Sequence, residues 1–236
     1  MSDLPSLPPP PPPAAATSAG GGLPWELRER YGALQGLAET VRLMISTPAA
    51  AFEQARRQGD LVSPIAYAVL VGWVGIVGAR VWGFLIGTSI LDLMAPQVRE
   101  SAMLGFALSG IGLAAALIVA PIFLLVGLFV WSVILHLFLM LFGATRGSTT
   151  GFEGTVRVVA WSMTAQLAQL VPFAGGLLGL VWAIVLQTLG IVAFHRTSSG
   201  RALGAVVAPL ALGCLLLVVV FLGVLALIFG AVASSR

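Results

Sequence analysis

The sequence predicts an all-α membrane protein, a bundle of five transmembrane helices with the N-terminus in the cytoplasm and the C-terminus outside. Hydrophobic residues make up 58% of the 236-residue chain, charged residues make up only 9%, and the mean hydropathy is +1.03. A soluble domain carries about 25% charged residues. This chain has too few charges to cover a water-facing surface, so we expect most of its surface to face the lipid of a cell membrane.

Five hydrophobic runs supply the expected spans, because a helix needs about 20 apolar residues to cross the hydrocarbon core of a bilayer. The runs are residues 64–91, 104–142, 152–171, 174–194 and 203–232. The third run is the most polar of them. The connection at residues 172–176 (Pro-Phe-Ala-Gly-Gly) is short, which predicts that the third and fourth spans form an antiparallel hairpin.

The second run is long enough for two short spans that turn at Pro121, or for one long helix through it. All basic residues are arginine, and their placement decides between the two arrangements. With one helix, the arginine-bearing loops after the second and fourth spans lie on the same side as the N-terminal arginines, as the positive-inside rule requires. We therefore expect one kinked or tilted helix, preceded by an outer loop at residues 93–101.

Two segments precede the spans. Residues 1–24 contain a six-proline run followed by alanine, serine and glycine, which predicts a disordered proline- and glycine-rich tail. A docking peptide for a proline-binding partner is the alternative. Residues 25–62 carry apolar residues at helical spacing among charges, which indicates amphipathic helices on the cytoplasmic membrane surface. Residues 63–233 then form the five-span membrane domain.

The stretch from Thr47 to about Val232 resembles the Yip domain family, whose members are named for interacting with Ypt/Rab GTPases, and it is most similar to the bacterial members. No single piece of this resemblance is specific, but the order and spacing of the pieces agree with the family. The pieces are Pro48-x-x-x-Phe52 with Gly59-Asp60-Leu61-x-x-Pro64, Gly151-Phe152-Glu153-x-Thr155-x-Arg157-Val158 leading to Ala160-Trp161-Ser162, Val171-Pro172-x-x-Gly175-Gly176, and Gly190-Ile191 continuing through His195 to Arg201-Ala202.

The resemblance implies a non-enzymatic, five-span membrane protein, in the inner membrane if the source is bacterial. Eukaryotic relatives act in vesicle trafficking and bind prenylated Rab GTPases. The family motif at the start of the first span reads Asp-Leu-Tyr-Gly-Pro, and Val62-Ser63 replaces its Tyr-Gly here. The binding of a GTPase is therefore not carried over to this chain.

Arg80 is a charged residue inside the first span, about 24 Å along the helix at 1.5 Å per residue. An arginine at mid-bilayer costs at least about 2.5 kcal/mol on insertion scales. Two explanations remain open: the side chain extends to the outer interface beside Trp82, or it lines a polar cavity.

Small residues recur every four positions along the same span, so they share one helix face on which another backbone can approach closely. They are Gly75, Ala79, Gly83 and Gly87. The spacing favours packing within the chain, because four other spans need contacts. A homo-oligomer through the first span is the alternative.

Other polar residues of the spans are expected to make structural contacts. His136 is a lone histidine without ligand-type neighbours, so a hydrogen bond to another helix is expected rather than a metal site. Gln187, like Gln166 and Gln169, is expected to bond between helices rather than to line a substrate path. Glu153 and Arg157 have the i,i+4 spacing of an ion pair at a helix start.

These observations lead to a functional hypothesis. The sequence contains no catalytic motif, and we expect no metal and no cofactor. The leading interpretation is a scaffold or organiser in the lipid bilayer whose cytoplasmic face receives a protein partner. A small transporter or channel subunit is the alternative, motivated by Arg80 and the glutamines, and an accessory subunit of an enzyme is a third. Nucleic-acid binding is not expected, because the net charge is only +3 and the arginines are scattered.

Overall fold

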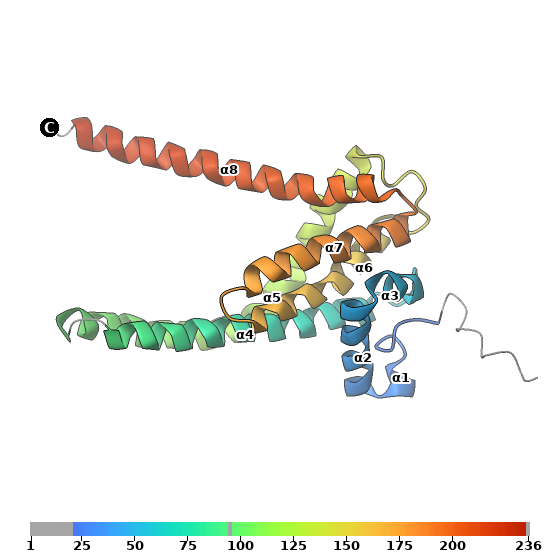
Figure 1. The fold of residues 1–236 in the computed structure, drawn as a ribbon, viewed down its shortest axis with the longest axis horizontal. Coiled ribbons are helices and arrows are strands. Elements are labelled where there is room, and N and C mark those ends of the chain that lie inside the picture. Colours follow the sequence, from blue (N-terminus) through green and yellow to red (C-terminus); the bar gives the residue numbers. More distant parts are fainter. Residues whose placement is uncertain (1–20, 94–95, 235–236) are drawn as a thin grey trace, which may run out of the picture.

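The computed structural model describes residues 21–93 and 96–234, and this part of the chain is helical without any strand. Its elements are α1 (Arg28–Tyr31), α2 (Ala33–Ser46), α3 (Pro48–Gln54), α4 (Val62–Leu93), α5 (Pro96–Leu141), α6 (Gly151–Ser162), the 3₁₀ helix η1 (Met163–Leu170), α7 (Gly175–His195) and α8 (Ser199–Ser234) (Figure 1). The predicted all-α class is confirmed. The tail at residues 1–20 lies outside the described residues.

Four described helices are long and apolar enough to cross a membrane: Val62–Gly87, Leu117–Leu141, Gly175–His195 and Ser199–Leu227. The remaining expected span, residues 152–171, is formed by α6 and η1, so it is not one continuous α-helix. Their combined rise is about 34 Å at the usual 1.5 and 2.0 Å per residue. A multi-pass membrane protein is therefore shown, while the count of five spans and the sides of the two termini stay predictions.

The core of the molecule is built around α6. Every residue from Gly154 to Ser162 is buried, and Trp161 packs against Tyr67 of α4 with ring centroids 4.9 Å apart. Helices α4, α5 and α7 all contact α6. This burial explains why the third hydrophobic run is the most polar one, because a segment surrounded by protein needs no continuous lipid-facing surface.

Close contact between α4 and η1 depends on glycine. A Cβ at Gly75 would lie 2.4 Å from the carbonyl oxygen of Gln166, and a Cβ at Gly78 would lie 2.5 Å from Cδ2 of Leu170. Both distances are shorter than real Cβ atoms allow. The glycines of α4 therefore let the backbone of η1 approach directly.

The second hydrophobic run forms one helix, as predicted, and α5 continues through Pro121. The expected outer loop at residues 93–101 is wrong for most of its length, because α4 ends only at Leu93 and α5 already begins at Pro96. The far part of α8 extends away from the bundle (Figure 1). Its large apolar side chains from Leu212 to Leu227 are exposed, as lipid-facing side chains are.

The segment before α4 forms an N-terminal unit, residues 21–61, that packs on the ends of α4, α6 and α7. Helix α2 runs across the direction of α4 (Figure 1). Phe52 of α3 meets Phe194 of α7 edge-to-face, with ring centroids 6.4 Å apart. Leu23 is fully buried, although the sequence pattern assigns it to the tail. The unit is thus packed on the bundle through apolar contacts as well as polar ones.

Candidate functional site

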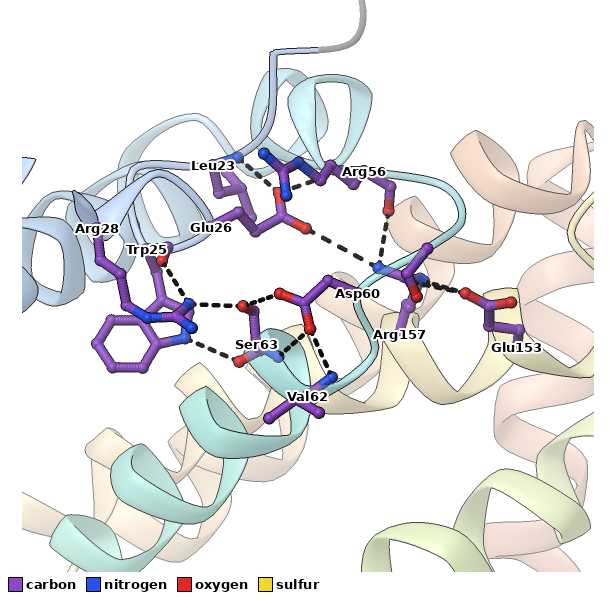
Figure 2. Close-up of polar contacts among 11 residues, drawn as sticks. Leu23, Trp25, Glu26, Arg28, Arg56, Asp60, Val62, Ser63, Glu153 and Arg157 are labelled. Carbon is purple, nitrogen blue, oxygen red and sulfur yellow. Dashed lines mark hydrogen bonds and ion pairs between the residues drawn. The ribbon is translucent and has the colours of Figure 1, made fainter. Parts of the chain in front are cut away.

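The most extensive polar cluster among the described residues joins the N-terminal unit to the bundle (Figure 2). We call it the arginine clasp, and it consists of Arg157 on α6, Glu153 one turn earlier, Glu26 before α1, and the chain from Arg56 to Gly59. Residues from three distant parts of the sequence meet here.

Arg157 is fully buried, and all three nitrogens of its guanidinium donate hydrogen bonds. Its Nε and Nη2 donate to Oε1 of Glu153 at 3.0 and 2.6 Å, so the ion pair predicted from the i,i+4 spacing is present. Nη2 also donates to the carbonyl oxygen of Gly59 at 2.9 Å, and Nη1 donates to that of Arg56 at 3.3 Å. A buried arginine fixes the linker before α4 in this way, because a guanidinium carries five donors in one plane.

Glu26 faces the other side of this guanidinium. Its Oε2 accepts hydrogen bonds from the backbone N–H groups of Leu23 at 2.7 Å and Arg56 at 3.1 Å. Its Oε1 makes no hydrogen bond and lies 3.9 Å from Nη1 of Arg157. Burial raises the pKa of Glu26 above its usual 4.5, and the backbone hydrogen bonds and the nearby arginines oppose that rise only in part.

Asp60 and Ser63 hold the start of α4 beside the clasp. Oδ1 of Asp60 accepts from the backbone N–H groups of Val62 and Ser63 at 3.0 and 3.2 Å, which satisfies donors that a helix start leaves free. The Ser63 hydroxyl donates to Oδ2 of Asp60, and this bond is the main reason why the pKa of Asp60 lies below 3.8.

Ser63 also anchors the N-terminal unit. Its hydroxyl accepts a hydrogen bond from Nη1 of Arg28 at 2.6 Å, and its carbonyl oxygen accepts one from Nε1 of Trp25 at 2.8 Å. The guanidinium of Arg28 lies over the Trp25 ring, 5.4 Å from the centroid. The first turn of α4 is therefore bonded to Trp25, which precedes α1, and to Arg28, the first residue of α1.

A second polar line runs through the same end of the bundle. Nδ1 of His136 lies 2.8 Å from the Thr155 hydroxyl, which lies 3.1 Å from Nε2 of the buried His195. Nδ1 of His195 in turn lies 2.8 Å from the Ser148 hydroxyl. The interhelical hydrogen bond expected for His136 is therefore present, and Thr155 bridges the two rings. Within the described part of the chain, no group of three or more His, Cys, Asp or Glu side chains could hold a metal ion.

Two other predicted residues, Gln187 and Arg80, lie outside these two polar clusters. Gln187 is buried and accepts a hydrogen bond from Nε1 of Trp131 at 3.0 Å. Arg80 is exposed on α4 and lines a cavity of about 650 Å³. The polar cavity and the outer interface both stay open as explanations of Arg80.

The stripe of small residues divides between two environments. Gly75 packs directly on η1, Ala79 and Gly83 line the Arg80 cavity, and a Cβ at Gly83 would have no atom within 4 Å. Gly87 is half-buried. A homo-oligomer through this face remains a prediction.

Sequence reasoning missed Glu26, Ser63 and the Thr155–His195 contact. The helical spacing of residues 25–62 assigns Glu26 to the water-facing charges. One signal was present: the apolar run Leu23-Pro24-Trp25 immediately before Glu26 favours burial of that segment. No spacing rule connects Glu26 to Arg157, because the two lie in different elements far apart in the sequence.

Comparison with known proteins gives one positive result. The family model described as the Yip1 domain matches residues 42–233, which is most of the chain and contains the membrane helices, Glu153 and Arg157. No curated protein matches the chain. No solved structure matches it either.

Proposed function

This chain belongs to the Yip1 domain family, and on that premise we propose that it is a non-enzymatic membrane scaffold whose N-terminal unit, on the cytoplasmic side, receives a protein partner. The observation that supports this proposal is the arginine clasp. The fully buried Arg157 makes three contacts with the N-terminal unit and so fixes it on the bundle, which gives the unit a defined surface.

The outward surface of the unit has the composition of a contact site. Leu34 is 84% exposed, and Tyr31 and Ile45 are also exposed on α1 and α2. Arg30 and Arg42 are exposed beside them. Apolar anchors with arginine nearby are typical of the residues that dominate protein interfaces.

Site-specific photo-crosslinking in native membranes tests the proposal. A photoreactive residue replaces Leu34 on the N-terminal unit or Phe173 in the loop before α7, an apolar position that is 91% exposed. Phe173 is a matched control, because the N-terminal unit packs on the opposite end of α7. We expect a discrete protein adduct at position 34 that is absent at position 173.

Three results would contradict the scaffold proposal. They are a shared adduct at both positions, adducts to lipid alone at position 34, and a turnover activity of the purified protein. Lipid adducts alone would mean that α2 rests on the membrane surface.

A small transporter or channel subunit is the second candidate. The observation that favours it is the cavity lined by Arg80, Gln166 and Gln169 in a membrane protein. Solute or ion flux in proteoliposomes that is abolished by a leucine at Gly83 would support this function over the scaffold.

A further inference from the structure

Two adjacent cavities are lined by residues of α4, α5, α6, η1, α7 and α8. The first, about 530 Å³, is lined mostly by apolar side chains, among them Leu128, Trp131 and Leu180. The second, about 650 Å³, contains Arg80 and Gln169. They share Ile76, Phe123 and Gln166 as lining residues, so they lie side by side. We call the pair the Arg80 cleft, and each half has a volume in the range of about 300–1,000 Å³ that is typical of ligand sites.

The lining of the cleft changes from apolar to polar along η1, because of the geometry of this helix. A 3₁₀ helix has three residues per turn, so side chains three positions apart lie directly above one another. Met163, Gln166 and Gln169 form such a row. Met163 and Gln166 line the first cavity, and Gln166 and Gln169 line the second. Along this row the side chains therefore change from the thioether of Met163 to the amides of Gln166 and Gln169, and both amides share the second cavity with Arg80.

Arg80 has no countercharge in the described structure. Its side chain is exposed and makes no hydrogen bond or ion pair with the described residues, and no lining residue of either cavity is acidic. An unpaired arginine in a span is costly. Guanidinium groups bind phosphate oxygens strongly through paired hydrogen bonds. An anionic group in the cleft would supply the missing charge.

The rim of the cleft is apolar. Phe123 is 72% exposed at the boundary of both cavities, and Leu180 is exposed on α7. Both residues belong to candidate membrane spans. A ligand that enters past these side chains comes from the lipid phase rather than from water.

We propose that the Arg80 cleft binds one acidic phospholipid. Its phosphate lies against Arg80, with the amides of Gln166 and Gln169 as further donors, and an acyl chain occupies the apolar cavity beside Trp131. The amide oxygen of Gln187, which also lines this cavity, is already bonded to Nε1 of Trp131. Ala79 and Gly83 line the second cavity, and these two small residues leave room for the headgroup.

Native mass spectrometry of the full chain tests this site. The detergent-purified protein is equilibrated with equal amounts of dioleoyl-phosphatidylglycerol and dioleoyl-phosphatidylcholine, which have the same acyl chains. We expect one retained phosphatidylglycerol, preferred about tenfold over phosphatidylcholine. Inorganic phosphate added at millimolar concentration should not displace it.

Three variants separate the site from general lipid adhesion. Arg80→Gln should abolish the headgroup preference. Gly83→Leu should lower retention of both lipids, because it fills the cleft where the structure has open space. Arg146→Gln, which removes an exposed arginine of the loop after α5, should change neither. Size-exclusion chromatography verifies that each variant is folded. If Arg80→Gln does not fold, Gly83→Leu still tests the site.

The proposal would be overturned by equal retention of the two lipids, by a preference that survives in Arg80→Gln, or by unchanged retention in Gly83→Leu. Displacement by inorganic phosphate would point to a soluble anion as the ligand instead. An unchanged profile in Arg80→Gln would show that the side chain merely extends to the membrane interface.

Discussion

Arg157 and Glu26 face each other across the boundary between the N-terminal unit and the bundle, with 3.9 Å between Nη1 and Oε1 and both side chains buried. Oε1 of Glu26 makes no hydrogen bond within the described structure, so its contact with Arg157 is an ion pair without a hydrogen bond. The pair joins an element before the membrane domain to the most buried helix inside it.

Arg157→Met is expected to destabilise the protein by about 3–5 kcal/mol. Removing one partner of a buried ion pair leaves the other charge uncompensated, and here it also frees the carbonyl oxygens of Arg56 and Gly59. Thermal unfolding in detergent measures the loss, and trypsin should cleave faster after Arg56 or Arg57 because the linker is released.

Glu153→Gln is the matched control for this change. The Glu153 side chain is 38% exposed and shares Arg157 with two carbonyl acceptors and the Glu26 carboxylate, so its loss is expected to cost no more than about 1 kcal/mol. An equal or larger effect of Glu153→Gln would show that the i,i+4 pair, rather than the contact with the N-terminal unit, holds the clasp.

Glu26→Gln should remove the contribution of Glu26 to the pH dependence of stability. Burial raises the pKa of Glu26 above 4.5, so the fold favours its protonated form. Its contribution is therefore complete below about pH 4.5 and decreases as pH rises through the raised pKa of the folded state. Glutamine keeps an acceptor for the N–H groups of Leu23 and Arg56 but does not titrate. Melting temperatures of both proteins are measured from pH 4 to pH 8, and the melting temperature of the wild type should fall relative to that of the variant as pH rises. Parallel profiles would refute this account.

Gly75→Ala is expected to destabilise the α4–η1 contact by about 1–3 kcal/mol. The added Cβ would lie 2.4 Å from the carbonyl oxygen of Gln166, and a backbone atom cannot rotate away as a side chain can. Gly83→Ala adds the same methyl group in open space and should not destabilise the protein. Thermal unfolding of the two variants compares them, and equal losses would exclude close packing as the role of Gly75.

A reporter fused after residue 233 should be active outside the cytoplasm. Five passes put the C-terminus opposite the N-terminus, and α6 with η1 supplies the third pass only if it crosses the bilayer. Alkaline phosphatase activity and loss of green fluorescence at this fusion point measure the outcome. A fusion in the loop at residues 142–150 is the control and should be cytoplasmic. A cytoplasmic signal at both points would mean four spans.

Ser63 shows how a departure from the family pattern acquires a local role. The motif at the start of the first span has glycine at this position, and serine stands here. Its hydroxyl bonds both Asp60 and Arg28, two contacts that glycine lacks. The departure could be read from the sequence, but its partners could not, because Arg28 reaches Ser63 only after the N-terminal unit has folded back.

The sequence by itself determined the membrane class, the single long helix through Pro121 and the Glu153–Arg157 pair, because hydropathy, charge placement and i,i+4 spacing are local properties of the chain. Only the tertiary structure decided that residues 152–171 form a protein-surrounded α6 followed by a 3₁₀ helix, and that Arg157 meets Glu26. Hydropathy measures the transfer of a segment into an apolar medium. It does not distinguish lipid from protein as that medium, and contacts between distant segments exist only once the helices have packed.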